Sequence, residues 1–153
     1  MRILIVASIV IIGVVVAWRR SRSGPHWTSL AELGRLRVGQ EWRFRGRPQD
    51  PDPHLIIGRL EVDQTGRELV HVSVRGVRVV NPHHASGYVS EIGHLPLTRA
   101  AIDASVTELV AQGVPTPDLA EGYADWRSAR GGAFTASVAE AVEFAERAIT
   151  GNR

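Results

Sequence analysis

Residues 55–75, LIIGRLEVDQTGRELVHVSVR, decide the expected fold because they contain two strand patterns joined by a tight turn. The runs 55–63 and 67–75 are rich in Val, Ile and Leu, and the second has valine at positions 70, 72 and 74. Between them stands Gln64-Thr65-Gly66, a three-residue loop whose glycine suits the positive φ that such hairpins need. The stretch therefore predicts an antiparallel hairpin.

The neighbouring segments extend this hairpin into a small sheet. Residues 40–45 alternate between aromatic residues on one face and arginines on the other. Gly76 interrupts the pattern as a bulge or turn, and residues 77–80 resume it. We therefore expect an antiparallel meander of three or four strands. A long loop over residues 81–96 follows, with a short extended piece at 88–92.

Helical patterns surround the strands. The expected helices cover residues 26–38, 98–113, 116–126 and 137–149. The last one begins with Ser137-Val-Ala-Glu140, a capping box in which serine and glutamate satisfy each other's backbone amides. Because most helices follow the strands, the sequence favours an α+β domain: a small antiparallel sheet with three or so helices packed on one face.

The first 22 residues differ from the rest in charge and hydropathy. They carry four arginines and no acid, whereas the remaining 131 residues carry 14 arginines and 16 acids. Residues 3–18 have no charge and are mostly Ile and Val, which predicts a transmembrane helix of roughly 24 Å. The residues expected at the membrane interface are Trp18, Arg19, Arg20 and Arg22. A cleaved signal peptide and a buried core helix are the alternatives.

These patterns divide the chain into a transmembrane anchor with a basic flank (1–22), a linker (23–26) and a globular α+β domain (27–153). Arginines are more numerous after the apolar segment than before it, so the positive-inside rule favours a cytoplasmic C-terminal domain. The expected location is the inner membrane of a bacterium, as a single-pass protein. A periplasmic domain is the alternative orientation.

Composition and motifs exclude several kinds of site. Cysteine is absent, which removes disulfides, thiolate zinc sites and iron–sulfur clusters. The sequence has no G-x-G-x-x-G and no Walker A motif, and its six histidines lack the spacing of metal ligands. We therefore expect no cofactor and no metal. Acids outnumber arginines beyond residue 22, so nucleic acid is not an expected partner; strand arginines facing a nucleic acid or an anionic lipid remain an alternative.

Four residues are the candidates for catalysis. His71 lies on an expected strand and His94 near the end of the long loop. If the following helix packs back on the sheet, the two histidines approach each other with Asp103 or Ser105 nearby, as in a Ser–His–Asp arrangement. The sequence lacks the G-x-S-x-G elbow that often presents a nucleophilic serine. The alternative role for His94 is to fasten the loop to backbone carbonyls.

Tyr123, Trp126 and Glu121 are the candidates for a protein-binding surface. An exposed Tyr and Trp would supply a large contact area at small entropic cost, although such a pair can equally fill a core. Glu121 belongs to an acidic part of the chain, since residues 81–153 carry nine acids and five arginines. This part is suited to a basic partner.

The sequence therefore favours a membrane-anchored domain that acts by binding another protein, as an adaptor, an inhibitor or an immunity-type protein, and that is not an enzyme. The alternative is an enzyme of hydrolase type built around His71, His94 and Asp103. The two differ in a structural observation. An enzyme is expected to bring both histidines together in a concave pocket, whereas a binding module is expected to scatter them and to expose an apolar or acidic patch.

Overall fold

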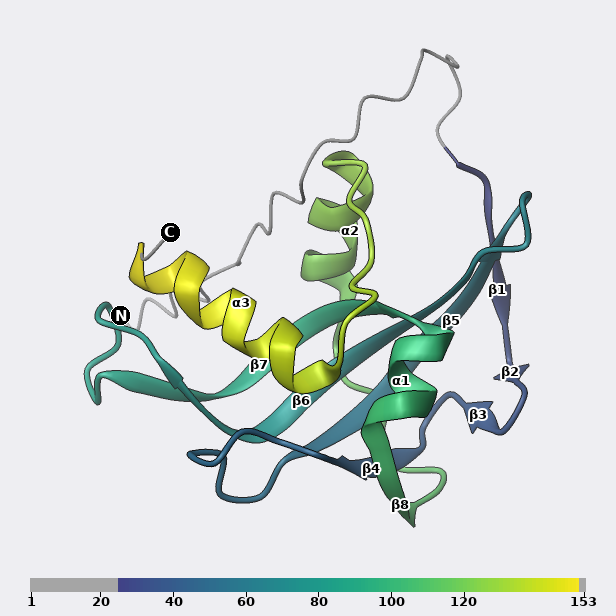
Figure 1. The fold of residues 1–153 in the computed structure, drawn as a ribbon. Helices are drawn as coiled ribbons and strands as arrows, with labels where there is room; N and C mark the ends of the chain where they lie inside the picture. The colour runs from purple at the N-terminus through teal and green to yellow at the C-terminus, as the bar shows by residue number, and fades with distance from the viewer. Residues whose placement is uncertain (1–24, 152–153) are drawn as a thin grey trace.

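The structure, a computed structural model, describes residues 25–151, and an antiparallel sheet of six strands forms its centre (Figure 1). The strands of this sheet are β1 (Trp27–Leu30), β4 (Glu41–Phe44), β5 (His54–Asp63), β6 (Glu68–Val80), β7 (Tyr88–Thr98) and β8 (Val106–Ala111). Their order is β7-β6-β5-β4-β8, and β1 pairs with β5 beside β4. Two short strands, β2 (Glu32–Leu33) and β3 (Leu36–Arg37), form a separate hairpin.

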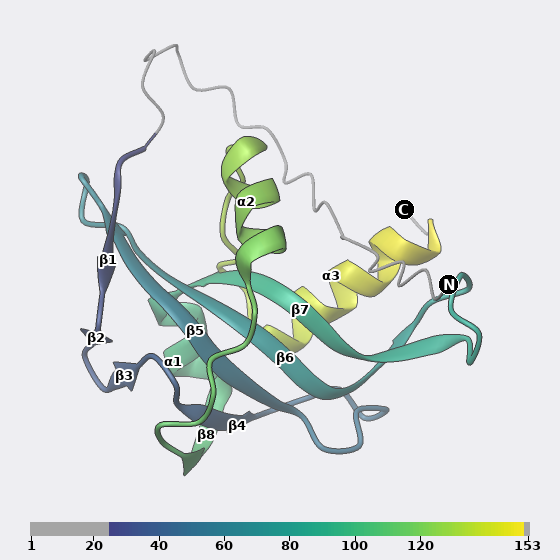
Figure 2. The same cartoon turned by 180° about the vertical axis from the view of Figure 1, so that it is seen from behind.

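Helices cover both faces of the sheet rather than one. The helices are α1 (Arg99–Ser105), α2 (Ala120–Ser128) and α3 (Val138–Thr150). In Figure 1, α1 and α3 lie in front of the strands, and in Figure 2, seen from behind, α2 and the loop before it do. The main hydrophobic core lies between the sheet and α1 and α3. Trp126 of α2 is buried against the opposite face, outside that core.

The predicted hairpin is confirmed, and its register explains the two faces. β5 and β6 pair so that Leu60 lies opposite Val70 and Ile57 opposite Val72, and these four side chains enter the main core. On the other face, Arg59 lies opposite His71. Because neighbouring residues of a strand point to opposite faces, the apolar requirement of one face places His71 on the other, under α2.

The last helix is also confirmed. α3 begins at Val138 with the predicted capping box: the Ser137 side chain accepts from the Glu140 amide, and the Glu140 side chain accepts from the Ser137 amide. Its buried residues continue the main core, and Gly151 ends it in the left-handed region.

The expected fold class is wrong in the size and arrangement of the sheet. β6 continues to Val80 past an irregularity at Gly76, as predicted: the pairing with β7 shifts register between Arg75 and Val79, and Gly76 has a φ of +66°. The expected loop 81–96 is mostly strand: β7 pairs with β6 along its length. Six strands with helices on both faces replace the predicted three or four with helices on one.

Two helix predictions are wrong because tertiary pairing overrides local periodicity. The segment 26–38 forms β1, β2 and β3, since β1 adds to β5. The predicted helix 98–113 ends at Ser105, after which β8 pairs with β4. Strand pairing supplies backbone partners that a helix-like spacing of apolar residues cannot reveal.

The membrane predictions also need correction. The expected span and its interface residues, Trp18, Arg19, Arg20 and Arg22, lie outside the described residues. Within residues 25–151, no helix combines the length and the apolar character that crossing a bilayer demands. The single-pass inner-membrane assignment therefore has no support in the structure.

Candidate functional site

A chain of polar side chains lies buried between the sheet and α2. It runs from Glu61 on β5 through His71 on β6 to His94 on β7, and we call these three residues the Glu–His–His chain. The side chains of Glu61 and His71 have no exposed surface. Buried polar groups are costly unless they are fully hydrogen-bonded, so the partners of each one decide what the chain does.

Glu61 is held by three donors. Its Oε1 accepts from the Arg59 Nε at 2.6 Å and from the Tyr123 hydroxyl at 2.5 Å, and its Oε2 lies 3.1 Å from the His71 Nε2. Burial alone would raise the pKa of Glu61, but the hydrogen bonds from His71, Tyr123 and Arg59 outweigh it and lower the pKa to about 2. The carboxylate therefore stays ionised at neutral pH.

The sheet register positions these donors. Arg59 and His71 face each other across the β5–β6 pair, and Ser29 of β1 lies opposite Glu61. The Arg59 guanidinium bonds to the Ser29 hydroxyl and lies over the Tyr123 ring, 4.4 Å from its centroid. Three strands and α2 thus converge on one carboxylate.

The two histidines are joined by a hydrogen bond of 2.9 Å between the His71 Nδ1 and the His94 Nε2. An ionised Glu61 can only accept, so the His71 Nε2 carries the proton between them. In neutral His71 the Nδ1 then accepts, and the His94 Nε2 must donate to it. The same logic leaves the Nδ1 of neutral His94 with its lone pair free.

The His94 Nδ1 has no hydrogen-bond partner within residues 25–151. Burial and the nearby His71 lower the pKa of His94 to about 4, although Glu61 acts in the opposite direction. Gly122 of α2 packs directly on the ring: a Cβ there would come within 2.6 Å of the His94 Cβ and 3.2 Å of its Nδ1. The absence of a side chain at Gly122 thus allows α2 to approach His94.

Tyr123 and Trp126 form the aromatic cover of the chain rather than a free surface. Their ring centroids lie 5.2 and 4.7 Å from that of His71, both edge-on, and Trp126 also contacts Trp27 of β1. Tyr123 is half-buried and Trp126 is buried. The predicted binding residues Tyr123 and Trp126 therefore lie at the same site as His71 and His94. The third predicted binding residue, Glu121, is exposed and lines the groove that opens beside this site.

A groove of about 730 Å³ opens beside His94. It follows β7 from Tyr88 to His94 and is bordered by the β6–β7 loop and the first turns of α2. Gly122 and Glu121 both line it. The volume lies in the range of small-molecule sites, so the exposed end of the Glu–His–His chain faces a space that a ligand can enter.

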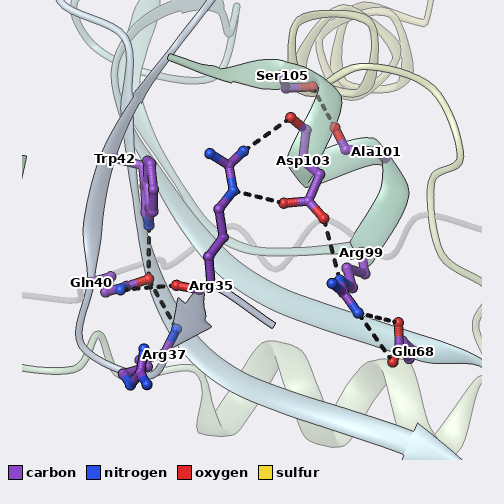
Figure 3. Close-up of polar contacts among 9 residues, drawn as sticks. All are labelled: Arg35, Arg37, Gln40, Trp42, Glu68, Arg99, Ala101, Asp103 and Ser105. Carbon is purple, nitrogen blue, oxygen red and sulfur yellow. Dashed lines mark hydrogen bonds and ion pairs between the residues drawn. The ribbon is translucent and has the colours of Figure 1, made fainter. Parts of the chain in front are cut away.

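Asp103 and Ser105, the other catalytic candidates, lie elsewhere. Figure 3 shows the Asp103 carboxylate directed at Arg35 and Arg99. The buried Ser105 hydroxyl donates to the Ala101 carbonyl and accepts from the Val138 amide, which ties α1 to the start of α3. Neither side chain joins the histidines, so a Ser–His–Asp triad is absent from the described part of the chain.

Glu61 and Arg59 are functional-site residues that the sequence did not single out as candidates. Counting residues outward from the loop 64–66 places Arg59 opposite His71 and Glu61 two positions away on the same face. The strand register of the hairpin was therefore the sequence signal that could have identified both residues.

No group of three or more His, Asp or Glu within residues 25–151 has the geometry to hold a metal ion.

Acid is expected to destabilise the protein in two pH windows. Folding disfavours protonation of His94, whose pKa falls from 6.5 to about 4, so stability drops as the pH falls between those values. The lowered pKa of Glu61 adds a second loss between 4.5 and about 2. Urea midpoints at about pH 7 and about pH 5 test the first window, which lies above most carboxylate titrations. Equal midpoints would contradict a neutral, partly buried His94.

Comparison with known proteins finds no matching family model, no similar curated protein and no similar solved structure. What the site does must therefore be inferred from its own residues.

Proposed function

We propose that the protein is an enzyme in which His94 acts as a general base, supported by His71 and Glu61, on a substrate bound in the groove along β7. The observation that carries this proposal is the hydrogen-bonded chain itself, which begins at a buried carboxylate and ends at a ring nitrogen without a partner among residues 25–151. This nitrogen is not among the buried polar atoms that lack a partner, so water or a substrate in the groove can reach it.

The chain can move a proton away from the groove. When the His94 Nδ1 takes a proton from a water molecule, its Nε2 can pass its own proton to the His71 Nδ1. The positive charge then rests on His71, against the Glu61 carboxylate. His94 itself returns to a neutral ring, which the low pKa favours.

This arrangement suits hydrolysis by an activated water. The hydroxide formed at His94 attacks an electrophilic carbonyl of the substrate, and the proton stored on His71 returns through His94 to the leaving group. The described groove residues place no serine or threonine hydroxyl in hydrogen bond with His94, so a direct attack by water fits better than a covalent intermediate.

The hydrolysis of p-nitrophenyl acetate, an activated ester, tests the role of His94. His94→Gln is expected to lower the rate by about tenfold, below the full effect of a general base on a matched substrate. His54→Gln is the matched control, because His54 is also a partly buried strand histidine, lies outside the groove and contacts Asp52 and Glu41. Its rate is expected to equal that of the wild type.

A second readout separates catalysis from folding. Both variants are expected to keep the wild-type circular dichroism spectrum. His71→Gln is expected to lower the hydrolysis rate as His94→Gln does, because both substitutions break the same hydrogen-bonded chain. A His94→Gln variant that is folded and as active as His54→Gln would contradict the proposal.

A further inference from the structure

The geometry of β7 points to the class of ligand that the groove takes: we propose that an extended, basic peptide segment binds along the edge of β7 as an added strand. That this segment is also the substrate rests on the function proposed above. The binding itself does not depend on His94 chemistry.

β7 is the edge strand of the sheet, and only part of its outer edge is covered. Near its C-terminal end, the Thr98 amide donates to the Phe134 carbonyl and the Phe134 amide donates to the Pro96 carbonyl. From Tyr88 to His94, no strand within residues 25–151 pairs with the outer edge. Unpaired strand edges are the usual docking sites of extended peptides.

The open part of this edge coincides with the groove. Every residue from Tyr88 to His94 lines it, which is a continuous run of β7. At about 3.3 Å per residue the run is about 23 Å long and matches an extended segment of roughly seven residues. The shape therefore favours an extended main chain over a compact metabolite.

The charge of the groove selects a basic segment. Its described lining residues include four carboxylates and no arginine, in a chain with 18 arginines. The acidic residues are Glu91, Asp118, Glu121 and Asp125. Of these, Glu91 contacts Arg75, the Asp118 side chain accepts from the Ala120 amide, and Glu121 takes part in a further interaction. The α2 side of the groove is thus negative, opposite the edge that would bind the main chain.

His94 lies at the end of the open edge, where the Phe134 pairing begins two residues later. The backbone of a strand added to β7 would run about 4.8 Å from the β7 backbone. One end of the added segment would therefore lie next to His94, whose ring extends from β7 toward His71 on β6. The same geometry links docking at the edge to hydrolysis at His94.

Fluorescence anisotropy with a labelled heptapeptide of alternating arginine and valine tests the docking. The full chain is expected to bind it, and to bind more weakly both the peptide with glutamate in place of arginine and the peptide N-methylated at alternate amides, which cannot add as a strand. Asp125→Asn is expected to weaken binding about threefold, as removal of a partly exposed charge does. Glu143→Gln, on the exposed side of α3, is the matched control and is expected to leave binding unchanged.

Equal binding of the N-methylated peptide would overturn strand addition, and equal binding of the glutamate peptide would overturn the charge argument. Failure of the two proposals can be told apart. Peptide binding without any His94-dependent hydrolysis would contradict the enzymatic function and support the docking site. Loss of ester hydrolysis in His94→Gln, with no peptide binding by the wild type, would overturn the docking site alone.

Discussion

Replacing Glu61 with alanine is expected to lower the free energy of unfolding by about 3 kcal/mol, because it leaves a fully buried donor without its acceptor. The Glu61 side chain is fully buried and accepts from Arg59, His71 and Tyr123. Its loss leaves the fully buried His71 Nε2 unpaired, whereas Arg59 and Tyr123 keep partial access to water. Urea unfolding followed by circular dichroism measures the change.

Glu61→Gln and Glu91→Ala are the comparisons for this prediction. Glutamine keeps the shape but turns one acceptor into a donor, so its cost is expected to lie between those of the two alanine variants. Glu91 lies on β7, two strands away from Glu61, and binds Ser73 and Arg75. Half of its side chain is exposed, so its loss is expected to cost less than about 1 kcal/mol. A Glu61→Ala variant as stable as Glu91→Ala would contradict the burial of an ionised chain.

Asp50→Ala is expected to be similarly damaging, at about 3–5 kcal/mol, for a reason independent of the site. The Asp50 side chain is fully buried and accepts from the backbone amides of Arg47 and Arg78 and from the Arg47 guanidinium. The Arg47 side chain is itself 7% exposed; it also donates to the Arg78 carbonyl and contacts Glu146 of α3 at 3.4 Å. Without Asp50, the buried Arg47 guanidinium and the backbone amides of Arg47 and Arg78 lose an acceptor.

Asp52→Ala is the matched control for Asp50. Asp52 lies in the same β4–β5 loop and pairs with Arg43, but 57% of its side chain is exposed. Surface ion pairs contribute little, so a much smaller loss than that of Asp50→Ala is expected. Urea unfolding of both variants decides the matter, and equal losses would mean that the Arg47–Asp50 pair does not anchor this loop to β6 and α3.

The central hairpin could be read from the sequence because two local signals agreed. The loop 64–66 fixed the register, and the valines of β6 fixed the buried face. The capping box at Ser137 located α3 for the same reason, since serine and glutamate act within one turn.

The rest of the sheet depends on contacts that are distant in sequence. β7 contains Ser90, Gly93 and Pro96, residues typical of loops, yet it is a strand because it pairs with β6 from Leu69 to Val80. Residues 106–111 share a helical spacing with α1 but pair with β4, more than 60 positions earlier. Local periodicity does not carry such information.

The sequence predicted only part of the site. The sequence could suggest that His71 and His94 meet, and the structure brings them within 2.9 Å. The sequence could not show that Glu61 is the acid of the chain. Arg59 and Glu61 alternate with the apolar residues Leu60 and Val62, which is the pattern of a strand with one solvent-exposed face. Only the position of α2, set by the packing of Tyr123 and Trp126, makes that face buried.

The tautomers of the two histidines test the central claim most directly. Long-range ¹H–¹⁵N correlation spectra of the imidazole rings, recorded at about pH 7 on the full chain, report which nitrogen carries each proton. The Glu–His–His chain predicts a proton on the Nε2 of both His71 and His94 and an unprotonated His94 Nδ1. A His94 ring protonated at Nδ1, alone or together with Nε2, would contradict its role as a base.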